Sequence, residues 1–341
     1  MKSSLLNPLH HVLAWSRLLG RPALAACAAS LALAAPAQAA WPDRPVTIIV
    51  PFASGGGSDI TARLIAKELG ESLHQSFIVE NKPGASTQIA TRHVINSAPD
   101  GNTLLLGTIS LINNPVLYKN LNYDAAKGLR SVINLVDVPD FLLVTSSLGA
   151  STAKEFLAKA KTLSDANKLN FGSAGTASSL HLAGEWLNQA AHLKGSHIPY
   201  KGSGPAMVAL AGGDVSYSIE NLGPALSSVQ SGRVKMLAVL GPKRYPTLPD
   251  VPTLHEATGM PDTDMASWFV LMAPAATPDS VVNLLNQKIN TILAKPEIRK
   301  QLLELGEIAV GGSPKDLSDR MKADGAKWIK VIEDGKVKID E

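Results

Sequence analysis

Short apolar runs and helix-spaced apolar positions alternate along the first part of the chain. Residues 46–52 form a nearly continuous, β-branched apolar run, which is typical of a parallel strand buried on both faces. A glycine-rich break follows, and apolar residues then recur at helical spacing over residues 60–73. Further strands at 77–80 and 103–107, with a helix over 87–97 between them, complete a βαβαβ unit. This order predicts a parallel sheet with right-handed crossovers.

The same pattern restarts in the middle of the chain and predicts a second lobe. Its strands are expected at residues 141–145, 169–171, 197–200, 215–219 and 234–240. Four prolines between 246 and 261 mark the path back, and the few strands beyond it complete the first lobe rather than a third domain. The sequence thus predicts an α/β fold of two lobes, each a mostly parallel sheet flanked by helices. The expected boundaries are 40–138 plus 256–341 for the first lobe and 139–255 for the second.

The N-terminus has the pattern of a secretory signal peptide. Lys2, Arg17 and Arg21 precede the apolar run 23–35, which is too short to cross about 30 Å of hydrocarbon as a helix. The small-x-small site 37–39 follows, so we expect cleavage after residue 39 and a periplasmic product starting at Ala40. One alternative is an uncleaved membrane anchor. Another is a lipoprotein attached at Cys27, which the two arginines disfavour because they interrupt the apolar stretch before it.

Charge and cysteine content exclude several kinds of partner. Without the leader, 29 Lys and Arg balance 29 Asp and Glu, and a neutral surface argues against nucleic acid. Cys27 is the only cysteine, so the mature chain has no thiol for a disulfide or a metal. His192 and His197 lack partners at metal-binding spacing, and neither a GxGxxG nor a GxxxxGK[ST] phosphate loop occurs. We therefore expect no metal and no cofactor.

Three glycine- and serine-rich connections carry the candidate chemistry. Residues 54–58, 172–178 and 201–204 each follow a predicted strand and precede a predicted helix, at the sheet edge where open α/β folds bind ligands. The first turn of a helix has unpaired N–H groups with about half a positive charge, so two such turns could hold a small carboxylate. The alternative is that they are ordinary strand-to-helix turns. Ser58 is expected to cap its helix, and Asp59 either complements the helix dipole or contacts the ligand.

Several blocks of this chain resemble the receptors of tripartite tricarboxylate transporters, known as the Bug family. Residues 51–63 are similar to the family pattern PFxPGGxxDxxAR. Further matching blocks, in the family's order and spacing from about Trp41 to Ile339, are Val79-Glu80-Asn81-Lys82-Pro83-Gly84-Ala85, Pro99-Asp100-Gly101, Ser173-Ala174-Gly175 with His181, Leu182 and Glu185, His197-Ile198-Pro199-Tyr200-Lys201-Gly202, Leu248-Pro249-Asp250-Val251-Pro252-Thr253 and Ala273-Pro274.

The resemblance implies a type II periplasmic binding protein of the "Venus flytrap" kind, a receptor and not an enzyme. It would hold a di- or tricarboxylate, an aromatic carboxylate or a similar organic acid between its lobes. It would then deliver the acid to a large and a small membrane subunit of the transporter, acting as a monomer. The residues implied in binding are Phe52, Ala53, Ser54, Gly55, Gly57 and Asp59 in one jaw, Ser173, Ala174, Gly175 and Ser178 in the other, and Thr108, Ser110, Tyr200 and Lys201 nearby.

Departures from the family pattern leave the far end of the ligand open. Ser54 stands in place of a proline, and Ser86-Thr87 stand where the family often has two glycines, which adds side chains near the pocket mouth. Lys201 could complement a second carboxylate or be a solvated loop lysine. Two other functions stay open: a periplasmic sensor with the same cleft, and a secreted serine hydrolase. The hydrolase is disfavoured because GxSxG is missing and Ser173 has no evident Asp–His pair.

Overall fold

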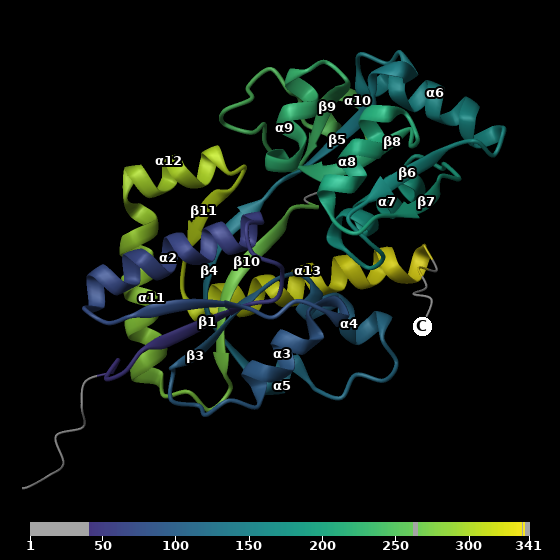
Figure 1. Cartoon of the computed structure of the whole chain (residues 1–341). Helices are drawn as coiled ribbons and strands as arrows, with labels where there is room; N and C mark the ends of the chain where they lie inside the picture. The colour runs from purple at the N-terminus through teal and green to yellow at the C-terminus, as the bar shows by residue number, and fades with distance from the viewer. Residues whose placement is uncertain (1–40, 262–264, 336, 338–341) are drawn as a thin grey trace, which may run out of the picture. The chain divides into compact units, whose positions relative to one another are not determined.

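The computed structural model describes residues 41–261, 265–335 and 337 (Figure 1). The expected signal peptide, residues 1–39, and Cys27 lie outside these residues. From Arg44 onward the chain groups as one compact unit. Within the described part of the chain, every helix is too short or too polar to span a bilayer.

The first sheet has six strands in the order β11-β4-β10-β3-β1-β2 (Figure 1). Strand β1 pairs in parallel with β2 and β3, as the βαβαβ pattern predicts. Strand β10 is antiparallel to both β3 and β4, and β11 is antiparallel to β4. The bounds are β1 Val46–Val50, β2 Phe77–Asn81, β3 Thr103–Gly107, β4 Leu129–Val138, β10 Ser267–Pro274 and β11 Ile308–Gly311.

The second sheet has five strands in the order β7-β6-β8-β5-β9. Strand β6 is parallel to β7 and β8, whereas β5 is antiparallel to β8 and β9. The bounds are β5 Asp140–Thr145, β6 Asn170–Ser173, β7 Ser196–Pro199, β8 Tyr217–Asn221 and β9 Val234–Leu240.

The two sheets confirm an α/β fold with two lobes, but both sheets are mixed rather than mostly parallel. The reason lies in how the chain changes sheets. Strand β4 ends at Val138 and β5 begins at Asp140, so the chain passes into the second sheet without a crossover helix. Two parallel neighbouring strands need a crossover connection between them. Strands next to the points where the chain changes sheets lack that connection, and they pair antiparallel: β4 with β10, and β5 with β9.

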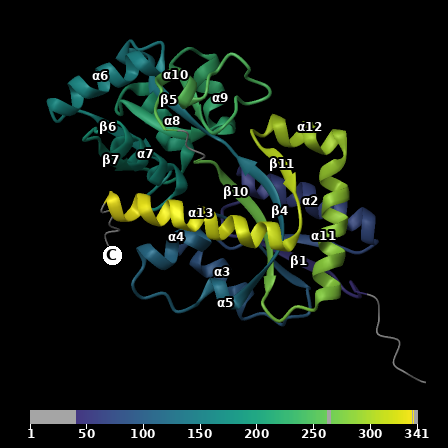
Figure 2. The same cartoon turned by 180° about the vertical axis from the view of Figure 1, so that it is seen from behind.

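Helices cover both faces of the first sheet. Ile49, Leu105 and Val270 share one core cluster with residues of α3 and α13. Because side chains alternate along a strand, Ile48 and Leu104 point to the opposite face, where α2 and α11 contact each other. Figure 2 shows α13 lying along the sheet beside β4, which it contacts. The bounds are α2 Gly57–Leu73, α3 Gln88–Ile95, α4 Ser110–Leu117, α5 Ala125–Gly128, α11 Asp279–Ala294, α12 Pro296–Glu304 and α13 Pro314–Asp334.

The second lobe is built around stacked aromatic side chains. Phe171 of β6 and Tyr217 of β8 are fully buried, with ring centroids 5.3 Å apart, and Phe156 meets Tyr217 edge-on. The helices of this part are α6 Ala153–Asp165, α7 Ser179–Ala190, α8 Ser203–Gly212, α9 Leu222–Gln230 and α10 Leu254–Thr258. Among the described residues, 3₁₀ turns are η2 Ala85–Thr87 and η3 Ser146–Leu148.

Hydrogen bonds join helices beside the first sheet to residues beside the second sheet. Gln189 Nε2 of α7 donates to the carbonyl of Val331 in α13 at 3.0 Å. On another side, the Tyr245 hydroxyl donates to the carbonyl of Leu303 in α12 at 2.8 Å. Since α12 and α13 are C-terminal to β10, the end of the chain contacts both lobes and is part of their junction.

Candidate functional site

The three glycine-rich connections lie where the sequence places them, between a strand and the helix that follows. The pairs are β1 with α2, β6 with α7, and β7 with α8. Because β1 and β3 are parallel neighbours, Thr108 after β3 lies at the same sheet edge as the loop after β1. We call residues 51–56 the first-lobe loop and residues 174–178 the second-lobe loop. Each loop is at a carboxyl edge, which is where ligands bind in this class of sheet.

The first-lobe loop is exposed and is held from below by Asp59. Residues 52–57 are exposed to solvent, whereas Asp59 is only 3 % exposed. Its carboxylate accepts the Gly55 N–H at 2.9 Å and Arg63 Nε at 3.0 Å, both at Oδ2. Burial acts to raise the pKa of Asp59, but its hydrogen bonds with Arg63, Gly55 and Asn81 outweigh burial and lower the pKa. Asp59 is therefore a charged anchor whose oxygens already have donors from the chain.

Asn81 is a second anchor of this loop, and the sequence analysis did not identify its role. Its Nδ2 donates both to Asp59 Oδ1 and to the Phe52 carbonyl, each at 3.0 Å. It is the last residue of β2, beside β1, so sheet pairing brings it to the loop. The expected cap at Ser58 is wrong: α2 begins at Gly57, its N-cap is Gly56, and no side chain caps it.

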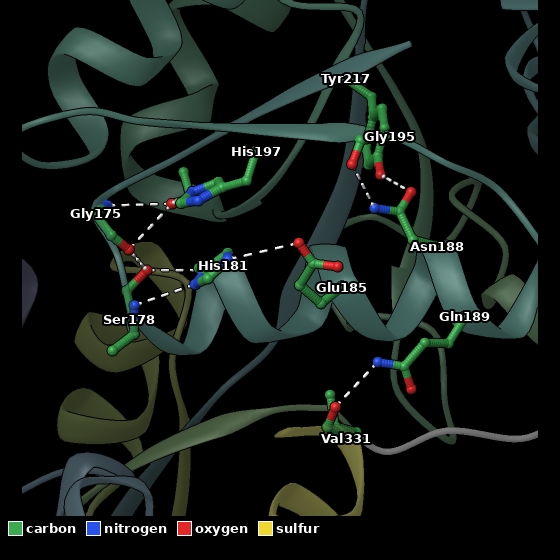
Figure 3. A network of polar contacts seen from close by, with 12 residues as sticks. Gly175, Ser178, His181, Glu185, Asn188, Gln189, Gly195, His197, Tyr217 and Val331 are labelled. Atoms are coloured by element: carbon green, nitrogen blue, oxygen red, sulfur yellow. Dashed lines mark hydrogen bonds and ion pairs between the residues drawn. The ribbon is translucent and has the colours of Figure 1, made fainter. Parts of the chain in front are cut away.

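The hydroxyl groups of Ser173 and Ser178 both form hydrogen bonds with Gly175 in the second-lobe loop, and Figure 3 shows Ser178 beside Gly175. Ser173 is fully buried, and its Oγ lies 3.1 Å from the Gly175 carbonyl and 3.2 Å from the Gly175 N–H. Ser178 Oγ donates to the same carbonyl at 2.7 Å and accepts the His181 N–H at 3.2 Å, as the N-cap of α7. Both hydroxyl groups, expected to face the ligand, have partners within the loop.

A stacked histidine pair supports this loop from inside the lobe (Figure 3). The rings of His181 and His197 are 3.7 Å apart and nearly parallel. His181 Nδ1 accepts the Ala177 N–H at 3.1 Å, which leaves Nε2 as the protonated nitrogen, 3.6 Å from Glu185. His197 Nε2 lies 2.7 Å from Ser173 Oγ. Burial, and then the neighbouring His181, lower the pKa of His197 to about 3, so this ring is neutral at physiological pH.

Tyr200 and Lys201, both expected near the ligand, have different surroundings. The Tyr200 N–H donates to the Ser173 carbonyl at 3.0 Å, and the next bond along, from Gly202 N–H to Ala174 carbonyl, is 3.1 Å. The Tyr200 ring lies over Gly172, where an added Cβ would be 3.3 Å from Cε2. Lys201 is exposed. These bonds place Tyr200 and Ala174 side by side at the edge of the second sheet.

Two buried glutamates that no sequence pattern predicts lie at the glycine-rich connections, Glu220 beside Ser203 and Glu307 beside the start of α2. Glu220, fully buried at the carboxyl end of β8, accepts Ser203 Oγ at 2.8 Å and the Asn221 N–H at 3.0 Å, both at Oε1. Its Oε2 has no hydrogen-bond partner among the described residues. Burial raises the pKa of Glu220 to about 7. A single glutamate near the end of a strand is usually exposed, so the sequence around Glu220 does not indicate that it is buried.

Glu307 lies beneath the start of α2 and beside the second lobe. It accepts the Thr61 hydroxyl at 2.6 Å, and a Cβ added at Gly57 would be 3.5 Å from its Oε1. Burial raises the pKa of Glu307 to about 8. The preceding Gly306 packs against Leu222 at the start of α9, where an added Cβ would be 2.7 Å from the leucine Cβ. This segment therefore connects the first-lobe loop with the second lobe.

Each loop, together with the helix start beside it, includes amide donors that have no partner among residues 41–261 and 265–335. Next to the first-lobe loop, these include the N–H groups of Gly57 and Ser58, the first two residues of α2. At the second-lobe loop, they include the N–H groups of Thr176, within the loop, and of Ser179, the first residue of α7. Helix starts leave such groups unpaired and positively polarised, which suits an anion. That the loops face each other across a cleft stays a prediction.

A hollow of about 750 Å³ lies elsewhere in the first lobe, between α4, β4 and α13. Leu111, Met272 and Met321 contribute apolar surface to it. Two of its cations have acidic partners, Arg130 with Asp279 and Lys315 with Asp319. We place the candidate site at the loops because they offer unpaired donors to an anion. Among the described residues, no cluster of three His, Cys, Asp or Glu could hold a metal ion.

Comparison with known proteins gives consistent results. The family model described as "Tripartite tricarboxylate transporter family receptor" matches residues 61–337. The protein BugT of Bordetella pertussis is 33% identical over 314 residues, which is 91% of this chain and 95% of BugT. The structure of Rhodopseudomonas palustris Rpa4515 with adipate is 35% identical with a TM-score of 0.80, covering 87% of this chain and 99% of the other. That of MatC from the same species with bound malate is 32% identical, with a TM-score of 0.75 and coverage of 86% and 100%.

Proposed function

This chain belongs to the family of tripartite tricarboxylate transporter receptors, which are periplasmic solute-binding proteins, and we propose that it captures a small organic carboxylate. The ligand is held in an interlobe cleft, between the first-lobe loop and the second-lobe loop. The observation that carries this proposal is the set of unpaired amides at the two loops: those of Gly57 and Ser58 at the start of α2, and those of Thr176 and Ser179 just before and just after the N-cap of α7.

A carboxylate fits these donors better than other small solutes do. Two N–H groups at a helix start are spaced to bind the oxygens of one anion, and the helix dipole favours negative charge there. The anchors Asp59 and Ser173 hold the loops in shape, so little ordering is needed when the ligand binds. Structures of two relatives contain adipate and malate, which supports an organic acid as the ligand.

The proposed setting is the periplasm, with the signal peptide of residues 1–39 removed. The receptor, a monomer, closes on its ligand and delivers it to the membrane subunits of a tripartite tricarboxylate-type transporter. A sensor with the same cleft would bind the same acids. Uptake of the ligand by cells that lack this chain distinguishes the two: uptake is lost if the chain serves transport and is kept if it serves sensing.

A hydrolytic function gains one feature from the structure but is not the better explanation. Ser173 and His197 are within hydrogen-bond distance, as a nucleophile and its base would be. Ser173 is fully buried, however, so a substrate carbonyl cannot reach its Oγ while the loop keeps this conformation. The ring of His197 also stacks on His181, whose Nδ1 accepts the Ala177 N–H of the second-lobe loop. This arrangement favours a structural role in holding the loop.

Thermal unfolding of the protein from residue 40 onward, with a panel of organic acids, tests the proposal. The panel contains adipate, malate, citrate, benzoate and glutamate, with adipamide as the uncharged control for adipate. A ligand bound only by the folded state at about 100 times its Kd stabilises that state by about 2.7 kcal/mol. We expect at least one acid to raise Tm and adipamide to have no effect. Unchanged Tm values with every acid would contradict the proposal.

A further inference from the structure

A cluster of hydroxyl groups lies at the carboxyl end of β3, beside the first-lobe loop. Thr108 Oγ1 and Ser110 Oγ are 2.6 Å apart, and Thr87 Oγ1 donates to Ser110 Oγ at 2.9 Å. Ser86 Oγ and the Tyr118 hydroxyl form a second pair at 2.6 Å. Thr87 and Thr108 are buried, whereas Ser86 and Ser110 are partly exposed. We call these five residues the hydroxyl cluster.

The hydroxyl cluster has more hydroxyl protons than its own hydrogen bonds use. Thr87, Thr108 and Ser110 carry three hydroxyl protons, and the two bonds among them use two. Ser86 and Tyr118 carry two, and their one bond uses one. Whichever atom donates in each pair, one proton remains in each group without an acceptor among the described residues. The first group lies beside the buried Thr87 and Thr108, the second is partly exposed, and each can donate its spare proton to an acceptor from outside the protein.

The backbone that presents Ser86 and Thr87 is held in an unfavourable conformation. Ala85, Ser86 and Thr87 have φ values of 46°, 48° and 71°, in the left-handed region that suits glycine. Each such residue costs on the order of 1–2 kcal/mol. The segment is fixed by Asn114, whose Nδ2 donates to the Ser86 carbonyl at 2.7 Å. The chain thus keeps two hydroxyl side chains where glycines would fit with less strain.

We propose that the hydroxyl cluster binds the second carboxylate of a dicarboxylate ligand. The proposal rests on the proposed function, because the first carboxylate is taken by the amides of the loops. A carboxylate has two oxygens that accept hydrogen bonds, and the cluster has two spare donors. Parallel pairing of β1 with β3 puts the cluster one strand, roughly 5 Å, from the strand that carries the first-lobe loop. A ligand of a few carbons can therefore reach both.

The experiment compares dicarboxylates with monocarboxylates of the same length, by isothermal titration calorimetry. The pairs are adipate with hexanoate, glutarate with pentanoate, and succinate with butanoate. We expect the wild-type protein to bind at least one dicarboxylate more than tenfold more tightly than its partner. In the double variant Ser86→Gly/Thr87→Gly this preference should fall at least tenfold, while monocarboxylate affinity stays within twofold. Tm should not fall by more than a few degrees, because glycine accepts the left-handed backbone.

Two further variants complete the test. Thr108→Val removes one hydroxyl while keeping the side-chain shape, and it should lower the dicarboxylate preference without touching the strained backbone. His74→Gly is the matched control, since His74 ends α2 at φ 51° and is exposed, away from the hydroxyl cluster. It should leave every affinity unchanged.

The outcomes separate this inference from the proposed function. Equal wild-type affinity for both members of every pair overturns the inference and leaves the proposed function standing. An equal loss for both members in the Ser86→Gly/Thr87→Gly and Thr108→Val variants also overturns it, because the cluster would then support the fold alone. If the wild-type protein binds no acid of either kind, the proposed function itself fails.

Discussion

Glu220→Gln should remove part of the pH dependence of stability between pH 5 and pH 8. Burial raises the pKa of Glu220 from 4.5 to about 7, so the folded protein holds a proton that the unfolded chain has released. Stability from this group is fully present below about pH 4.5 and is lost as the pH rises through 7. At about 1.4 kcal/mol for each pKa unit, the loss amounts to about 3 kcal/mol. A glutamine has no proton to release, so the variant should lack this loss.

Urea unfolding of the wild-type protein and the variant at pH 5, 6, 7 and 8 measures the effect. The wild-type free energy of unfolding should decrease toward pH 8, and the Glu220→Gln value should decrease by about 2.5 kcal/mol less over the same range, because part of the total loss occurs below pH 5. Glu71→Gln is the control, because Glu71 is an exposed glutamate on α2. The free energy of unfolding of the variant should still decrease with pH, because burial also raises the pKa of Glu307, to about 8.

Parallel curves for the wild-type protein and Glu220→Gln would refute the reasoning. They would mean that Glu220 is already ionised at pH 5, with its Oε2 satisfied by a donor from solvent. In that case the unpaired oxygen would be a hydration site, and the carboxyl group would not titrate with folding.

Three substitutions, in α2, at the N-cap of α7 and within α7, have effects that follow from the contacts of the replaced residues. Ser178→Ala removes the N-cap of α7 and should cost about 1 kcal/mol in urea unfolding while weakening adipate binding in calorimetry. Gly184→Ala should destabilise the protein by about 1–3 kcal/mol in urea unfolding, since its Cβ would be 2.3 Å from Cε2 of the buried Phe171. Asp59→Asn should weaken adipate binding at pH 7 in calorimetry, because the Gly55 N–H loses a charged acceptor.

Each of these substitutions has a matched control elsewhere in the chain. Thr152→Ala removes the N-cap of α6 and should cost similar stability without changing adipate affinity. Gly204→Ala, in α8 with open space around its Cβ position, should not destabilise the protein. Asp316→Asn alters a helix start at α13 in the same way as Asp59→Asn and should leave adipate affinity unchanged. If a control lowers adipate affinity as much as its partner, the loop is not the binding element.

Local sequence determined most of the individual elements. The apolar run at 46–52 and the helical spacing that follows correspond to β1 and α2, and the helix expected over 87–97 contains α3. These segments have strong periodicity, and each can be identified without its neighbours. Strand β4 was not predicted, because Arg130, Ser131, Asn134 and Asp137 interrupt its apolar pattern. The two charged residues have partners far along the chain, Asp279 for Arg130 and Arg320 for Asp137.

Local sequence also predicted where the candidate site residues lie, but it did not predict which residues they contact. Glycine turns after strands marked the loops around Gly57 and Ser178, whereas the bond from Asn81 to Asp59 joins β2 to α2 and the contact between His197 and Ser173 joins β7 to β6. Ser173 and Ser178, expected as ligand donors, are committed to the loop itself. Sequence alone gives the residue types of a loop and cannot give which of their donors are already used.

By itself, the sequence determined that this chain forms alternating strands and helices with donor-rich turns at the strand ends, because that information lies within about fifteen consecutive residues. The tertiary structure decided the mixed pairing of both sheets, the burial of Glu220 and Glu307, and the stacking of two histidines under one loop. Pairing, burial and the pKa values that follow from burial depend on residues distant in sequence, and only the folded chain brings those residues together.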